Sequence, residues 1–185
     1  MKMDWKLIGE GIGIVAIIIS FFVFLSNRRK TIILCKGITD VLWCFNNFMI
    51  GATTGAVLNI VMVFREFVFY NRLDKKWAQH KFWMVIFCAM CFASPIIEII
   101  NTGTFDILPF FPAVGSVFAV FGFYNTKPTR MRAFNFLAST PWLIYTIIEG
   151  NVTCAISTAI GMISAIVGEI SARRAAKKET AAKEE

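Results

Sequence analysis

The chain has 185 residues, of which 57% are hydrophobic and 17% charged, and it contains 19 phenylalanines. This composition is too apolar for a soluble domain of this length, so it predicts an integral membrane protein. The formal net charge of +7 does not indicate nucleic-acid binding, because the basic residues form short clusters at the ends of apolar runs.

Apolar runs follow one another along the whole chain, separated by short polar connections. Crossing a hydrocarbon core of about 30 Å takes roughly 20 helical residues. We therefore expect transmembrane helices at 7–26, 31–49, 52–70, 82–101, 105–124, 131–149 and 151–171. The alanine-rich, charged segment 172–185 should continue the last helix into water as a cytoplasmic tail. The sequence thus predicts an all-α membrane protein with seven transmembrane helices.

Basic side chains gather in alternate connections, after the first, third and fifth runs, and again in the tail. They are Arg28, Arg29, Lys30, Arg72, Lys75, Lys76, Lys81, Lys127, Arg130, Arg132, Arg173, Arg174, Lys177, Lys178 and Lys183. Positive charge near the ends of membrane spans stays on the cytoplasmic side. This asymmetry predicts an N-terminus outside and a C-terminus in the cytoplasm.

Shifting the chain by 99 residues reveals an internal repeat, in which 28–60 lies over 127–159. Trp43 then coincides with Trp142, and Asn59 with Thr158. Such self-similarity indicates repeated structural units.

The repeat divides the chain into four parts. We expect a first three-helix repeat at 1–72, a basic loop and linker helix at 73–103, a second three-helix repeat at 104–171, and the tail at 172–185. Because the odd linker helix returns the chain to its starting side, the two repeats should be parallel. In such transporters the solute site lies between the repeats.

This 3+1+3 layout resembles the SWEET and PQ-loop superfamily. The stretches GATTGAVLNIVMVFREFVF, ILPFFPAVGSVFAVFGF and TPWLIYTIIEGNVTCAISTAIGMISAIVG look like the YgjV family of bacterial inner-membrane proteins. The likeness to sugar-carrying SWEETs implies that Trp43 with Asn59, and Trp142 with Thr158, line a central pocket. The Pro-Gln motif is absent from the first predicted helix, so the resemblance does not imply a sugar substrate.

Asp40 lies inside a predicted span, in the stretch TDVLWCFNN. A carboxylate at mid-membrane costs roughly 2.5–3.5 kcal/mol on insertion scales and tends to face the protein interior. Lys36, one helical turn earlier, could pair with it; a proton or cation relay and solute binding are the alternatives. The second half has Ser139 at the equivalent place, and we include both residues in the candidate solute site. Asn59 could contact solute or a neighbouring helix.

Polar residues and prolines farther along the helices suggest moving parts. Asn46 and Tyr145 lie toward the outer mouth and are candidates for a gate. Proline inside a helix frees a backbone carbonyl and bends the helix, so Pro141, Pro109 and Pro112 are candidate hinges.

Catalytic constellations are missing from the sequence. There is one histidine, His80, in a basic connection, no paired carboxylates at a shared depth, and no glycine-rich phosphate loop. We therefore expect no enzyme activity, no cofactor and no metal.

The sequence favours a small-solute transporter of the bacterial inner membrane, either a facilitator or an ion-coupled carrier. A non-transporting binding or assembly factor of the same fold is the alternative, because fold does not fix function. The expected partners are the lipid bilayer and a small polar solute, without nucleic acid, and a homo-oligomer is compatible with the sequence.

Overall fold

The computed structural model describes residues 5–49, 53–148 and 152–184, and within these ranges it is helical without strands. Seven long helices and one four-residue helix follow in order: α1 Trp5–Val23, α2 Arg29–Met49, α3 Thr53–Asn71, α4 Lys76–Gln79, α5 Phe82–Thr102, α6 Phe110–Tyr124, α7 Pro128–Ile148 and α8 Val152–Glu184. The predicted helices are confirmed, and their bounds differ from the prediction by a few residues except at α6.

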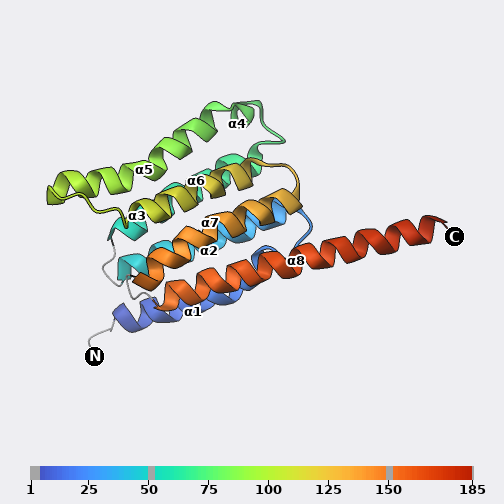
Figure 1. The fold of residues 1–185 in the computed structure, drawn as a ribbon, viewed down its shortest axis with the longest axis horizontal. Helices are drawn as coiled ribbons and strands as arrows, with labels where there is room; N and C mark the ends of the chain where they lie inside the picture. Colours follow the sequence, from blue (N-terminus) through green and yellow to red (C-terminus); the bar gives the residue numbers. More distant parts are fainter. Residues whose placement is uncertain (1–4, 50–52, 149–151, 185) are drawn as a thin grey trace.

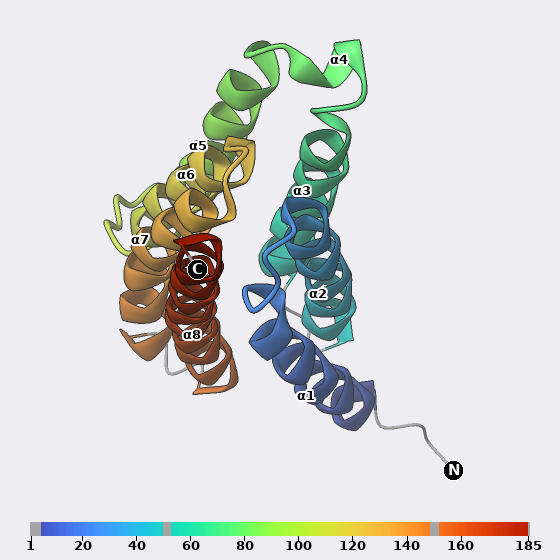
Figure 2. The same cartoon turned by 90° about the vertical axis from the view of Figure 1, so that its right-hand side faces the viewer.

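The helices form two layers that stand face to face (Figure 2). In the first triplet α1 packs on α2 and α2 on α3; in the second triplet α6 packs on α7 and α7 on α8. The layers meet where α1 contacts α8 and where α3 contacts α5 and α6, while α5 lies along α6. Helices α1, α3, α6 and α8 run in one direction, and α2, α5 and α7 in the other (Figure 1).

One end of the molecule carries the connections 24–28, 72–81 and 125–127, and α8 extends beyond the bundle from this end (Figure 1). We call it the basic end, because most of the lysines and arginines lie there. The tail continues α8 as helix to Glu184, as predicted.

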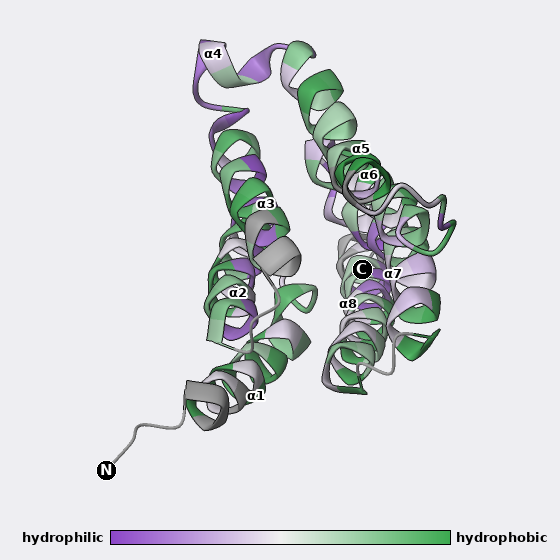
Figure 3. Ribbon diagram, turned by 90° about the vertical axis from the view of Figure 1, so that its left-hand side faces the viewer, coloured by the Kyte–Doolittle hydropathy of each residue, from purple (hydrophilic) through white to green (hydrophobic). Residues whose placement is uncertain are grey.

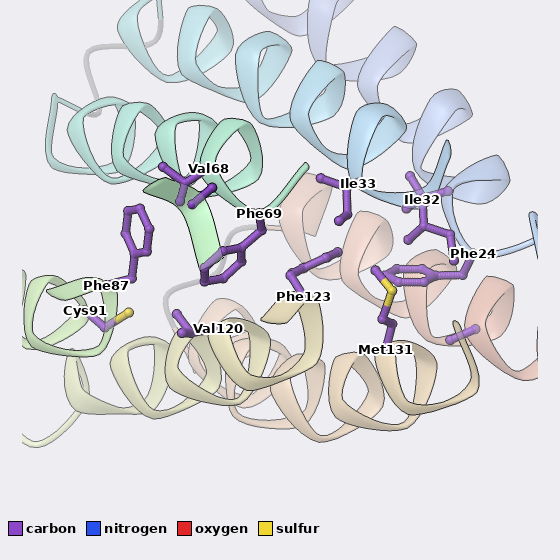
Figure 4. Close-up of a cluster of buried hydrophobic side chains, with 13 residues drawn as sticks. Phe24, Ile32, Ile33, Val68, Phe69, Phe87, Cys91, Val120, Phe123 and Met131 are labelled. Carbon is purple, nitrogen blue, oxygen red and sulfur yellow. The ribbon is translucent and has the colours of Figure 1, made fainter. Parts of the chain in front are cut away.

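The apolar core lies at the basic end and draws residues from all seven long helices (Figure 4). Phe69 contacts the rings of both Phe87 and Tyr124, so α3, α5 and α6 meet through aromatic packing. On the outside, large apolar side chains are exposed, for example Ile14 and Ile147. Hydrophobic segments cover much of the ribbon, whereas the α4 region is hydrophilic (Figure 3).

Hydropathy alone identifies fewer spans than predicted. Of the residues that the structure describes, one helix, Val152–Ala182, is both long and apolar enough to cross a membrane. Shorter apolar segments occupy Gly11–Val23, Phe82–Ile97 and Phe110–Tyr124. Helices α2 and α3 have a lower mean hydropathy than α1, α5 and α6, because they carry charged residues along their length, among them Lys36 and Arg65.

The helix expected from residue 105 begins only at Phe110. Gly103 ends α5 in the left-handed conformation, with φ of 66°, and its N–H donates to the Ile99 carbonyl at 2.9 Å. The Asp106 carboxylate then accepts the Leu108 N–H at 2.9 Å. A short acidic side chain that binds the backbone two residues later favours a turn over a helix.

The candidate hinge prolines occupy different positions in their helices. Pro109 immediately precedes α6, and Pro112 lies in its first turn, where backbone N–H groups have no partner within the helix. Neither proline removes a helical hydrogen bond. Pro141 lies inside α7, where it does. A freed backbone carbonyl is thus expected at Pro141, and a hinge role for any of the three prolines stays a prediction.

Candidate polar site between the helix layers

Four charged side chains on α2 and α3 form a cluster that we call the charge quartet: Lys36, Asp40, Arg65 and Glu66. The side chains of Asp40, Arg65 and Glu66 are 3%, 2% and 3% exposed, and that of Lys36 is 27% exposed. With both carboxylates ionised, two positive charges balance two negative ones. The quartet is thus a neutral but highly polar interior.

Each carboxylate of the charge quartet uses one oxygen in an ion pair. Lys36 Nζ donates to Asp40 Oδ1, as the sequence spacing predicted. Arg65 Nη2 donates to Glu66 Oε1 at 2.6 Å. The remaining polar atoms, Asp40 Oδ2, Glu66 Oε2, Arg65 Nε and Arg65 Nη1, are buried and make no hydrogen bond. Unpaired groups of this kind are costly in a protein interior.

The charge quartet faces the second layer. The Arg65 guanidinium carbon lies 5.1 Å from the centre of the Phe123 ring on α6, and Cys91 on α5 lies near Arg65. Cys154 on α8 lies near Lys36. The quartet therefore lies on the side of α2 and α3 that faces α5, α6 and α8.

The two predicted pocket tryptophans each pack within their own triplet. A Cβ added to Gly13 of α1 would lie 3.8 Å from Trp43 Cζ3, and one added to Gly115 of α6 would lie 2.7 Å from Trp142 Cδ1. Trp142 also makes an edge-on contact with Tyr145, with ring centres 6.1 Å apart. Both tryptophans are half-buried.

Asn46, a candidate gate residue, ties two helices together. It is buried, and its Nδ2 donates to the Gly9 carbonyl of α1 at 2.7 Å. A fixed contact between α1 and α2 gives the side chain a structural role in this conformation. Its role as a gate stays a prediction.

The remaining predicted residues are half-buried on their helices: Asn59 on α3, Ser139 on α7 and Thr158 on α8. Thr158 Oγ1 donates to the Cys154 carbonyl at 2.8 Å, within its own helix. Cys154 in turn interacts with Lys36, so Thr158 lies one helical turn from the residue that faces the charge quartet.

Sequence reasoning overlooked Arg65 and Glu66, although both lie inside the span predicted at 52–70. The expectation that no two carboxylates share a depth is also wrong, since a Cβ on Gly37, about one turn before Asp40, would lie 3.5 Å from the Glu66 Cβ. The signal was present as adjacent charges in FREF, residues 64–67. Averaging hydropathy over a whole span concealed it.

A second set of buried charges closes the basic end. Arg29 of α2 donates through Nε to the Asn125 carbonyl at 2.9 Å. Its Nη2 donates to the carbonyls of Phe69 at 2.7 Å and Phe123 at 3.2 Å. Arg72 donates to the Tyr124 carbonyl and stacks on its ring. Three consecutive carbonyls at the end of α6 are thereby capped by arginines that belong to the first triplet.

Arg132 of α7 makes the reciprocal contact to the first triplet. Its Nε donates to the Phe24 carbonyl at 3.0 Å, and its Nη2 donates to Ser26 O at 2.8 Å and Asn27 Oδ1 at 2.7 Å. Helix C-termini attract cations because their last carbonyls are unsatisfied. Arg29 and Arg132 thus lock the two triplets together at the basic end, so they are more than solvated orientation signals.

Burial beside Arg72 lowers the pKa of Arg29 to about 10, with desolvation as the main cause. Asp74 opposes this shift. The guanidinium nevertheless stays charged at neutral pH, so the contacts at the basic end do not depend on physiological changes of pH.

The two-layer helical fold, its apolar exterior and its charged interior define a multi-pass helical membrane protein. The model of the bacterial inner membrane protein family YgjV matches residues 7–176, and the chain belongs to that family. The bacterial inner membrane is therefore its location. No curated protein matches the chain. The same holds for the solved structures.

Proposed function

We propose that the protein is a small-solute carrier whose central site lies between two parallel triplets, with the charge quartet at the centre of that site. The observation that carries this proposal is the set of four buried polar atoms on Asp40, Arg65 and Glu66 that have no hydrogen-bond partner. Ionisable groups inside membrane spans are expensive and typically mark the path of a solute or ion.

The alternative use of such charges is to hold α2 to α3. A well-packed apolar pair usually does this as well as or better than a buried ion pair. The structural arginines Arg29 and Arg72 each leave one buried nitrogen unpaired, whereas the charge quartet leaves four polar atoms unpaired. The unpaired atoms therefore favour a site that is completed by something other than the chain itself.

Several features support a SWEET-like arrangement of two parallel repeats. Shifting the bounds of α2, 29–49, by 99 residues gives 128–148, the bounds of α7, and shifting the start of α3 gives the start of α8. The basic connections lie at one end, which supports an N-terminus outside and a cytoplasmic C-terminus for seven membrane spans.

The chemistry of the charge quartet suggests the kind of solute. Two free carboxylate oxygens accept hydrogen bonds and two free guanidinium nitrogens, Nε and Nη1, donate them. A small polar solute with both donors and acceptors complements this set. In this proposal Trp43 and Trp142 form walls, Asn59, Thr158 and Ser139 add polar contacts, and the bend at Pro141 lets the second triplet rock.

The arginine contacts at the basic end are part of the proposed carrier mechanism. Arg29, Arg72 and Arg132 hold the triplets together there, so this conformation corresponds to a carrier closed toward the cytoplasm. Transport would require these arginines to exchange their carbonyl partners as that end opens.

Thermal unfolding of the purified protein in the presence of amino acids, sugars and organic acids tests the binding site. A solute that binds should raise the melting temperature of wild type, and Asp40→Asn and Asn59→Leu should lose that response while remaining folded. Thr140→Ala, an exposed position on α7, is the matched control and should respond like wild type. A normal response in both site variants would contradict the assignment.

Proteoliposomes then separate the carrier from a non-transporting binding or assembly factor. A carrier equilibrates the stabilising solute across the vesicle membrane, whereas the alternative binds the solute without moving it.

A further inference from the structure

We propose that the charge quartet binds one proton, held by the carboxylate pair of Asp40 and Glu66, and that this proton is the coupling ion of the carrier. The inference rests on the proposed transport function for its role in coupling. The proton site itself can be tested without any solute.

While the layers are closed around the quartet, enclosure of the free atoms selects the proton over larger species, and a solute reaches the same atoms once the layers open. Asp40 Oδ2 and Glu66 Oε2 are both covered by protein and both lack a donor. A water molecule or a metal ion needs space beside these oxygens. A proton needs none, because it bonds to an oxygen that is already there.

The charges around the pair also disfavour a metal cation. Lys36 and Arg65 place two positive groups on the two carboxylates, and they would repel a divalent metal ion more strongly than the single charge of a proton. In the part of the chain that the structure describes, no group of three or more His, Cys, Asp or Glu residues is arranged to hold a metal.

Protonation gives one of the two unpaired oxygens a bonded hydrogen, and the balance of charge is simple. One proton from water bonds to a free oxygen of one carboxylate, which becomes a neutral acid, and the charge of the quartet rises from zero to +1. In this proposal the two side chains approach each other, so that the new O–H donates to the free oxygen of the other carboxylate. Neighbouring carboxylates that share a site commonly hold one proton between them.

Few other groups near the pair can titrate. From α2 and α3 the pair contacts Lys36 and Arg65, and on α5 Cys91 lies near Arg65, with Cys88 one turn away. Cys154 of α8 lies near Lys36, and α6 presents the ring of Phe123. Within the described residues, Asp40 and Glu66 are thus the acidic groups at this depth that can exchange a proton.

Lys36 offers a route for the proton to reach the pair. It is the most exposed member of the charge quartet and contacts Asp40 directly. Opening of the layers beside Lys36 would hydrate the Asp40 carboxylate first and Glu66 afterward. Release of the proton would follow when the opposite side opens.

Infrared spectroscopy of the full chain in lipid nanodiscs tests the proton site, using protons alone as the ligand. Wild type should show the carbonyl band of a buried carboxylic acid, and this band should disappear as the pH is raised. Glu66→Gln or Asp40→Asn should remove the band, whereas Asp74→Asn, at an exposed carboxylate of the basic end, should keep it. Absence of the band from folded wild type at every pH, or its persistence in both site variants, overturns the inference.

Two further measurements keep the test decisive. If Glu66→Gln does not fold, Glu66→Asp retains the acid and should move the band to a new frequency. In proteoliposomes that equilibrate a solute, an imposed pH gradient should drive its accumulation. A band without such accumulation overturns the coupling role and leaves a facilitator, whereas failure of wild type to equilibrate any stabilising solute contradicts the carrier function itself.

Discussion

The first triplet carries charges at four interior positions where the second triplet carries neutral side chains. The charge quartet Lys36, Asp40, Arg65 and Glu66 has as counterparts, 99 residues later, Asn135, Ser139, Ser164 and Ala165. Three of these counterparts are buried, namely Asn135, Ser164 and Ala165. Helices with matching bounds therefore enclose very different interiors.

In the proposed carrier, the first layer would hold the charged site while the second forms a wall. Charges balance within the first triplet, so its interior is stable without a countercharge from the second. Ser164 instead accepts the Phe24 N–H at 3.2 Å and serves packing against α1. A rocking motion between the layers could then hydrate the charge quartet without separating its ion pairs.

The largest expected effect comes from breaking a buried ion pair in the first triplet. Arg65→Leu leaves Glu66 buried without a partner and should reduce the free energy of unfolding by about 3–5 kcal/mol. The double variant Arg65→Leu/Glu66→Leu should recover most of this loss, since no uncompensated charge remains. Denaturant unfolding of the purified protein in detergent provides the measurement.

Ser164→Ala is the matched variant at the counterpart position of Arg65. It removes one hydrogen bond and should cost about 1 kcal/mol. An equal loss for Ser164→Ala and Arg65→Leu would mean that the two interiors do not differ as described.

Removing an arginine of the basic end should come next in size. Arg132→Leu leaves the Phe24 and Ser26 carbonyls without their charged donor and should lower stability by about 1.5–3 kcal/mol. It should also speed the chemical labelling of a cysteine placed at Ser26. Arg130→Leu, at an exposed position on the same helix, should change neither. Unchanged labelling in Arg132→Leu would show that this arginine does not close the end.

Glycines under the two tryptophans give a smaller contrast between the triplets. A Cβ on Gly115 would lie 2.6 Å from the Ala138 carbonyl, whereas one on Gly13 would lie 3.0 Å from the side-chain Nδ2 of Asn46. Gly115→Ala should cost about 1–3 kcal/mol because backbone must move. Gly13→Ala should cost less, since the tip of a side chain can shift. Thermal unfolding of both variants ranks them, and the reverse order would contradict the packing.

The smallest effect is expected at the exposed pair of Lys30 and Asp74, whose charged atoms are 2.6 Å apart. The hydrogen bond from Lys30 to Asp74 raises the pKa of Lys30. The pair therefore contributes its full stabilisation at pH values below the ordinary lysine pKa. This contribution is lost as the pH rises through the higher folded value. Asp74→Asn should slightly lower the melting temperature at neutral pH and low salt, and the difference should vanish at alkaline pH. A difference that persists there would rule out the ion pair as its cause.

Much of the fold could be predicted because each helix is a local feature. Apolar runs indicated the existence and approximate bounds of the helices, and the spacing of Lys36 and Asp40 offered their pairing as one of three alternatives. The turn at 103–109 was missed because its cause, the bond from the Leu108 N–H to Asp106, is a local competition that an apolar average does not register.

The partners of the buried arginines could not be predicted for a different reason. Arg29 binds carbonyls 94 and 96 residues away, and Arg132 binds one 108 residues away. Backbone carbonyls leave no mark in the side-chain sequence, so a basic cluster beside a span looks the same whether it is solvated or buried. Arg65 and Glu66 carried a visible signal, namely two adjacent charges inside an apolar run.

The length of α8 has a practical consequence. At about 1.5 Å per residue its 33 residues extend roughly 50 Å, and a hydrocarbon core takes up about 30 Å of that. The remainder is a stiff rod of roughly 20 Å projecting from the membrane surface. A small tilt of α8 within the bilayer would sweep the rod's tip through a larger arc, so a dye attached there would report motions of the second triplet in amplified form.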